Sequence, residues 1–132
     1  MKTASPVPVT VEFEDVDSYG IAHHSKLVTY LERARLRFLA ANGLALSGDG
    51  CVPVMYSLEL RFRRPARLMD VLQVEVEVAG ADDFRIGLRY AIRRGDEVLV
   101  RARSVIAFWD REKDGPAPVP EPLRTRVAEG AR

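Results

Sequence analysis

The sequence predicts an α+β domain in which one long helix packs against an antiparallel sheet that wraps around it. Residues 25–42 repeat apolar side chains at helical spacing, whereas four later stretches alternate apolar and polar residues as strands do. A helix with one long apolar stripe needs a broad apolar partner, and a curved sheet supplies it.

The chain begins with a predicted strand over residues 7–13, in which apolar residues up to Phe13 alternate with polar or small ones. An acidic loop follows, where Gly20 can adopt backbone angles that are closed to other residues. The helix is predicted to start at Ser25 as N-cap and to stop at Gly43. Its predicted apolar stripe consists of Leu27, Leu31, Ala34, Phe38 and Ala41, and it is widened by Val28, Tyr30 and Leu39.

A glycine-rich loop at 44–52 precedes the strand region. The predicted strands are 54–63, 72–78, 84–93 and 98–109, and short turns between them predict a four-stranded meander. A single helix covers one face of the sheet and leaves the other face and an edge strand exposed. Pairing with a second copy would bury these surfaces, so the pattern favours a dimer. We expect a single domain over residues 1–132, with a loose lead-in at 1–6 and a Pro-rich strap at 111–132 holding at most one helical turn near 123–127.

Composition excludes several classes of protein. The net charge of +1 argues against a general nucleic-acid binder. The N-terminus lacks the apolar core of a signal peptide, and no run approaches the ~20 apolar residues of a membrane span. We therefore expect a cytoplasmic protein that neither binds nucleic acid nor enters a membrane. The single Cys51 can form no internal disulfide, and nothing near it favours a catalytic thiol.

The densest group of titratable side chains lies just before the helix, in the loop that holds Asp15, Asp17, Gly20, His23 and His24. Carboxylates and imidazoles beside a helix start favour acid–base chemistry and anion binding. By itself, an Asp before a Gly is more often a turn residue, and two adjacent histidines are an ordinary surface pair. Further metal ligands at suitable spacing are not evident, so neither a metal nor another cofactor is expected.

The segment FEDVDSYGIAHHSKLVTYLERAR resembles the signature of hot-dog-fold thioesterases of the 4-hydroxybenzoyl-CoA and acyl-CoA thioesterase type. That signature typically reads Y-x-D-T-D-x-x-G-x-V-Y-H-x-x-Y-(x)-(F/Y)-E-R-A-R. The matching positions are Asp15, Asp17, Gly20, His24 and the run Glu32-Arg33-Ala34-Arg35. The strand pattern up to about residue 110 also fits. The resemblance implies a hot-dog fold, with one long helix wrapped by a five-stranded antiparallel sheet.

The resemblance also implies catalytic roles. It makes Asp17 the catalytic carboxylate, either as nucleophile on the thioester carbonyl or as general base toward water. It places the backbone N–H of His24 where the thioester oxygen is polarised, and it lets the loop pass close to the acyl group at Gly20. Asp15 would support the loop. The further secondary candidates are His23, Glu32 and Arg35, of which the last matches an Arg used by some polyketide-associated relatives.

The resemblance further places the active site at a dimer interface. The residues of the partner subunit expected to line it are Val54, Met55, Tyr56 and Ser57. Such enzymes also form dimers of dimers, and we expect a dimer at least. A group of arginines is a candidate for contacts with coenzyme A phosphates or an acidic carrier protein, although a solvated strand end is an equally ordinary role: Arg61, Arg63, Arg64 and Arg67.

The sequence departs from the family pattern at three places. His23 and Leu27 each stand where a Tyr is common, and Asp82-Asp83 stands where some relatives carry basic residues for coenzyme A phosphates. Two acids repel a nucleotide 3′-phosphate, which favours an acyl carrier protein or a pantetheine thioester.

The predicted function is hydrolysis of an acyl or aroyl thioester, of coenzyme A or of an acyl carrier protein, to the free acid and thiol. One alternative is a carrier-protein thioesterase that releases a polyketide or fatty acyl chain, and another is a non-catalytic acyl-thioester binding module. A hot-dog dehydratase is less favoured because the helix lacks an acid at a dehydratase-like position.

Overall fold

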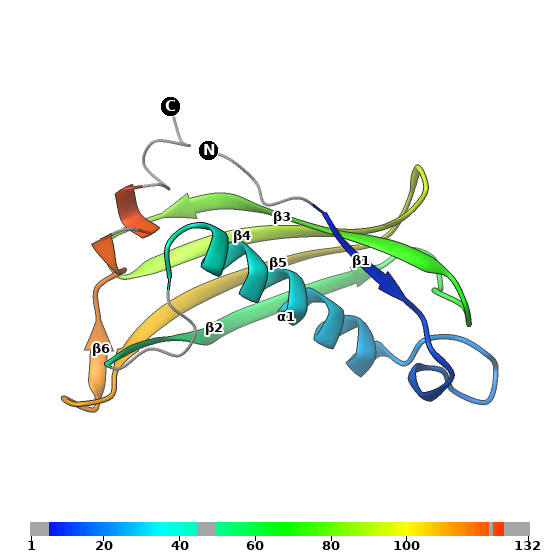
Figure 1. The fold of residues 1–132 in the computed structure, drawn as a ribbon, viewed down its shortest axis with the longest axis horizontal. Helices are drawn as coiled ribbons and strands as arrows, with labels where there is room; N and C mark the ends of the chain where they lie inside the picture. Colours follow the sequence, from blue (N-terminus) through cyan, green and yellow to red (C-terminus); the bar gives the residue numbers. More distant parts are fainter. Residues whose placement is uncertain (1–5, 45–49, 122, 126–132) are drawn as a thin grey trace.

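The computed structural model describes residues 6–44, 50–121 and 123–125 (Figure 1). Its elements are β1 (Val7–Thr10), a 3-10 turn η1 (Phe13–Asp15), α1 (His24–Ala41), β2 (Cys51–Phe62), β3 (Val71–Ala81), β4 (Arg85–Arg94), β5 (Glu97–Asp110) and β6 (Gly115–Ala117). Parts of three predicted segments lie outside the described residues, namely 1–5 of the lead-in, 45–49 of the glycine-rich loop, and 122 and 126–132 of the strap.

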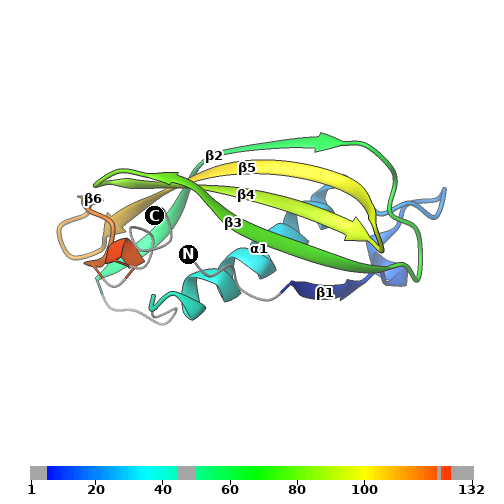
Figure 2. The same ribbon diagram turned by 90° about the horizontal axis from the view of Figure 1, so that it is seen from above.

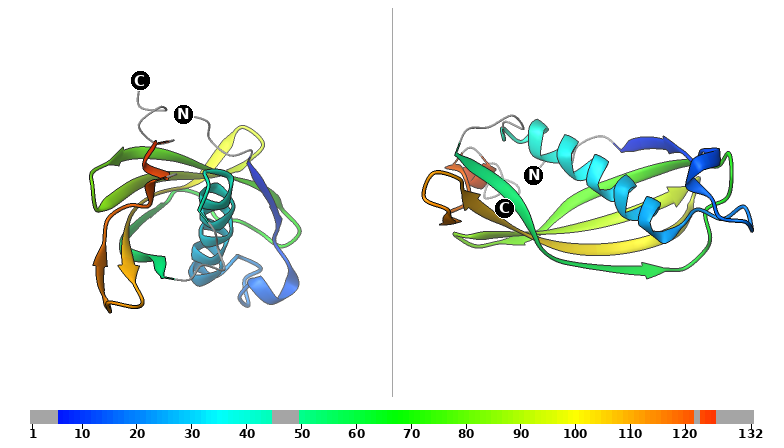
Figure 3. Two further views of the ribbon diagram at one scale, coloured as in Figure 1. Left: turned by 60° about the vertical axis from the view of Figure 1, so that its left-hand side comes forward. Right: turned by 90° about the horizontal axis from the view of Figure 1, so that it is seen from below.

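All the strands belong to one antiparallel sheet with the order β1-β3-β4-β5-β2, and the short β6 pairs with β5. The sheet bends around α1, which lies along its concave face (Figures 2 and 3). Register shifts occur in the β2–β5, β3–β4 and β4–β5 pairs, and such bulges increase the local bend and twist of a sheet. The predicted α+β hot-dog fold, one helix wrapped by five main strands, is confirmed.

The predicted meander is only partly correct. Strands β3, β4 and β5 follow one another in space, but β2 pairs with β5 at the far edge instead of with β3, and β1 takes the place beside β3. Alternation of apolar residues reports which face of a strand is buried and carries no information about its neighbour. The consequence is that β2, the longest strand after β5, is an open edge of the sheet.

Several predicted boundaries are wrong by a few residues. Phe13 leaves the first strand and is 80% exposed, because η1 starts there. The helix N-cap is His23 and not Ser25, since the His23 ring Nδ1 accepts the Ser25 N–H at 3.2 Å. Ala41 lies on the exposed side of the helix end. Phe84 precedes β4 and is exposed, in a turn where an Asp82 carboxylate oxygen accepts its N–H at 2.8 Å.

The strap differs from prediction as well, because residues 115–117 form β6 against the end of β5. Residues 121 and 123–125 are helical, where one helical turn was predicted, and the remainder of that prediction falls on residues outside the description.

The core lies between α1 and the concave face of the sheet. The buried residues of α1 are Leu27, Tyr30, Leu31, Ala34, Phe38 and Leu39, so four of the five predicted stripe residues are confirmed. They pack with inward-facing residues of the strands into one apolar cluster. No helix in the described part of the chain is long and apolar enough to cross a membrane. The core therefore fixes α1 on the sheet, and with it the N-terminal end of the helix, where the acidic loop ends.

Candidate active site

The loop that precedes α1 is closed by its own backbone hydrogen bonds. His23 N–H donates to the Asp15 carbonyl at 2.9 Å, and Asp17 N–H donates to the Ile21 carbonyl at 2.9 Å. Between these bonds the chain turns at Gly20, whose φ of +75° lies in the left-handed region that favours glycine. The sequence-predicted role of Gly20 as a turning point therefore has a direct conformational cause.

Asp17 is held in this loop by main-chain donors. Its Oδ1 accepts N–H groups from Tyr19 at 2.8 Å and Ile21 at 3.3 Å, and its carbonyl accepts the Gly20 N–H at 3.0 Å. Its other carboxylate oxygen, Oδ2, accepts no hydrogen bond from any described residue. The side chain is exposed in the single chain. The geometry thus orients the carboxylate through one oxygen and leaves the other available to a reacting group.

The start of α1 provides one unused donor. The Ser25 N–H donates to the His23 ring, and the Lys26 N–H donates to the His23 carbonyl at 2.9 Å. The N–H of His24, the first residue of the helix, has no acceptor among the described residues. The dipole of an 18-residue helix adds positive potential at this end. A free N–H at a helix N-terminus can stabilise an oxyanion that develops during acyl transfer.

Asp15 is tied to the helix by a side-chain hydrogen bond that the sequence did not predict. The buried Tyr30 donates its O–H to Asp15 Oδ2 at 2.7 Å, and the same oxygen accepts the Glu12 N–H at 3.1 Å. Burial alone raises the pKa of Asp15, but these two bonds and the charges of Lys26 and Arg33 outweigh it and hold the pKa below its usual value. Burial and the bond to Asp15 raise the pKa of Tyr30. The sequence feature that could have predicted this bond is a Tyr on an apolar helical stripe, because a buried Tyr hydroxyl needs a hydrogen-bond partner.

We expect Tyr30→Phe to lower the free energy of unfolding at pH 7 by about 1.5 kcal/mol, near the low end for a hydrogen bond to a charged group. The folded-state pKa of Asp15 is lowered, so its contribution is present above the unfolded pKa and is lost as the pH falls through the folded pKa. Urea denaturation of both proteins should therefore show a gap at pH 7 that shrinks below about pH 4. A gap of equal size at both pH values would contradict a bond to ionised Asp15.

The connection after β2 supports the loop from the other side. Ala22 N–H donates to the Ala66 carbonyl at 2.8 Å, and Leu68 N–H donates to the Gly20 carbonyl at 3.1 Å. This connection is anchored by Asp70, whose carboxylate meets the Arg94 guanidinium at 2.6 Å. The loop is thus held by α1 on one side and by residues 66–70 on the other.

The remaining predicted residues fall into three groups. Arg67 lies beside the loop through its bridge to Ile21, whereas Arg64 is paired with Glu97 at 3.0 Å. Glu32 and Arg35 form the expected helix pair at 3.4 Å, although the Arg35 side chain is only 13% exposed. A third group is distant. Residues 54–57 lie at the start of β2, near the C-terminal end of α1, whereas the loop lies at the other end of the helix (Figure 1). One chain therefore does not bring Val54, Met55, Tyr56 or Ser57 to Asp17, and exposed Arg63 forms no ion pair with a described residue.

Cys51 does not compete with Asp17 as a nucleophile. Burial raises the pKa of its thiol, and the negative charge of Asp110 raises it further. A thiol with a raised pKa holds little of the reactive thiolate near neutral pH.

Comparison with known proteins identifies a family and several relatives. The family model described as the thioesterase-like superfamily matches residues 11–127. The chain is 27% identical over 121 residues to the acyl-CoA thioesterase YbgC of Haemophilus influenzae, covering 89% of each protein. It is 26% identical over 102 residues to the acyl-CoA thioester hydrolase YbgC of Escherichia coli, covering 75% of this chain and 76% of that one. A solved structure of a probable thioesterase from Bartonella henselae superposes with a TM-score of 0.81 at 26% identity, covering 91% of this chain and 99% of that one.

Proposed function

Because this chain belongs to the thioesterase-like superfamily and is a thioester hydrolase, we propose that it cleaves acyl or aroyl thioesters of coenzyme A, with Asp17 as the catalytic carboxylate. The named relatives are acyl-CoA thioesterases, which supports coenzyme A as the thiol. The observation that carries the proposal is that one closed loop contains an oriented carboxylate and leads directly into an unused helix N–H.

In the proposed reaction the thioester carbonyl oxygen accepts the His24 N–H. Either the free oxygen of Asp17 attacks the carbonyl carbon and the thiolate leaves, after which water cleaves the resulting anhydride, or Asp17 takes a proton from the water that attacks. Both routes consume one water, break the C–S bond, and give one carboxylic acid and one thiol. Main-chain donors hold Asp17 in place before substrate binds, which reduces the entropy lost on reaching the reactive geometry.

We further propose that the active unit is a two-fold dimer. β2 is an edge strand whose first half carries exposed apolar side chains, including Tyr56 at 59% and Met55 at 40%. In an antiparallel pair of β2 strands the two strands run in opposite directions, so the start of one β2 lies beside the end of the other. That end leads into residues 66–70, which contact the catalytic loop. The partner would then supply residues 54–57 to the site, as predicted from the sequence.

Light scattering at micromolar concentration should accordingly report a mass of about 30 kDa, twice the 14.8 kDa of the chain, or a multiple of it for a dimer of dimers. The physical cause is the cost of leaving a long apolar edge strand unpaired in water. A species of ~15 kDa at this concentration would contradict the proposal of a two-fold dimer.

The thiol carrier is tested with one acyl group presented on different carriers. Asp82 is exposed, and the backbone N–H groups of Phe84 and Arg85 lower its pKa, so the carboxylate is charged at pH 7. If the acids at 82 and 83 lie near the coenzyme A nucleotide, the same acyl group should be turned over faster on pantetheine or an acyl carrier protein than on coenzyme A. A panel of short, long and aromatic acyl groups on both carriers, with released thiol measured, tests hydrolysis and carrier together. No turnover on any member would leave the binding-module alternative. A clear preference for coenzyme A would contradict the expected repulsion and would point to Arg63, Arg64 and Arg67 as candidate phosphate contacts.

A further inference from the structure

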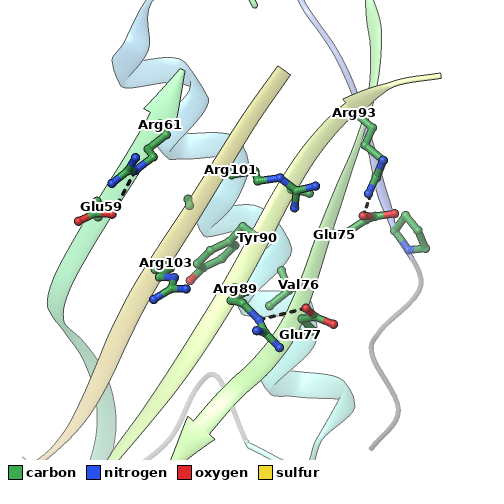
Figure 4. Close-up of a pocket in the computed structure, with 13 residues that line it drawn as sticks. Glu59, Arg61, Glu75, Val76, Glu77, Arg89, Tyr90, Arg93, Arg101 and Arg103 are labelled. Carbon is green, nitrogen blue, oxygen red and sulfur yellow. Dashed lines mark hydrogen bonds and ion pairs between the residues drawn. The ribbon is translucent and has the colours of Figure 1, made fainter. Parts of the chain in front are cut away.

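The outer face of the sheet, opposite α1, carries a hollow of about 770 Å³ that the catalytic mechanism does not use. Figure 4 looks onto this face, with the strands in front of the helix. We call it the arginine hollow, after the arginines that line it: Arg61, Arg89, Arg93, Arg101 and Arg103. Three glutamates also line it, so five positive and three negative side chains leave a local charge of +2.

Two pairs of these arginines stand directly opposite each other on neighbouring strands. Arg89 on β4 is in register with Arg103 on β5, and Arg101 on β5 is in register with Arg61 on β2. Like charges at opposed positions, with Cβ atoms about 4.5–5.5 Å apart, destabilise a sheet. All four side chains are exposed, so core packing does not require them. A bound anion would turn this repulsion into attraction.

The hollow also leaves its central cations unpaired. The arginines in ion pairs are Arg93 with Glu75 at 2.8 Å, Arg89 with Glu77 at 3.1 Å, and Arg61 with Glu59 at 3.7 Å (Figure 4). Arg101 and Arg103 form no ion pair with any described residue. The register neighbour of Arg101 on β4 is Ala91, whose small side chain leaves room beside the guanidinium.

We propose that the arginine hollow binds the diphosphate group of a nucleotide-type ligand, with Arg101 and Arg103 as its principal ligands. A guanidinium presents a planar fork that meets two phosphate oxygens at once. The two residues are i and i+2 on one strand face, about 6.6 Å apart, which suits two linked phosphates. The hollow lies within the size range of small-molecule sites, and its surrounding glutamates disfavour an extended nucleic acid.

The test is isothermal titration of the full chain with inorganic pyrophosphate at low ionic strength. We expect saturable binding, weakened about tenfold or more in Arg101→Gln/Arg103→Gln. The matched control is Arg37→Gln/Arg111→Gln, which removes the same charge from exposed positions outside the hollow and should bind as the wild type does. The hollow variant should melt no earlier than the wild type, because it removes like-charge neighbours. Since binding is measured without hydrolysis, the result does not depend on the proposed thioester chemistry.

Two nucleotide sources are distinguished by competition. Displacement of pyrophosphate by both ADP and coenzyme A would identify the nucleotide end of a coenzyme A thioester as a ligand, whereas displacement by ADP alone would indicate a free nucleotide. The proposal is overturned if the wild type shows no saturable binding, if ADP fails to compete, or if the control variant loses as much affinity as the hollow variant. A change in oligomeric mass of the hollow variant without pyrophosphate binding to the wild type would instead assign this face to a contact between copies.

Discussion

Replacing Asp17 by Asn is expected to reduce thioester hydrolysis by about 10²–10⁴-fold, the usual loss when a group acting in acid–base catalysis is removed. The amide nearly preserves the shape of the side chain and keeps an oxygen that can accept the Tyr19 and Ile21 N–H groups. It lacks the negative charge that either a nucleophile or a base requires. Turnover of the best panel substrate, with melting temperature alongside, is the measurement.

Two neighbouring variants serve as controls for that loss. Asp15→Asn should cost less activity, since Asp15 positions the loop through Tyr30 and is not the carboxylate assigned to the reaction. His24→Ala should cost little, because only its backbone N–H is assigned a role. If Asp17→Asn retains more than about a tenth of wild-type turnover, the loss is smaller than the expected range. Asp17 is then not the catalytic carboxylate. Attention would then move to Glu32 and Arg35.

Replacing Phe38 by Ala is expected to lower the free energy of unfolding by about 3–5 kcal/mol. Phe38 is fully buried on the face of α1 that packs against the sheet, and truncation of a buried aromatic side chain leaves a cavity in the only large core of the described residues. Urea denaturation followed by circular dichroism is the measurement. Leu36→Ala, at a position 38% exposed on the other side of the same helix, is the control and should cost much less. Equal losses would mean that α1 does not bury the face assigned here.

The local elements and the candidate catalytic loop could be identified from the sequence alone. Helical spacing from Leu27 to Phe38 identified the buried face of α1, and alternation identified the strands, because both periods follow directly from backbone geometry. The acidic loop stood out because Asp17 and Gly20 match a family signature at fixed spacing, and the φ of Gly20 is a local property that glycine itself permits.

Only the tertiary structure decided which distant segments meet. The pairing of β2 with β5 left an edge strand, and with it the basis for a two-fold site, since strand alternation does not encode a neighbour. The bond from Tyr30 to Asp15 and the support of Gly20 by residues 66–70 join segments far apart in the chain. The opposed arginines at 89 and 103 lie 14 positions apart, and no local rule predicts their register. Local geometry depends on neighbouring residues and can be read from their order, whereas these contacts exist only after the sheet has closed around the helix.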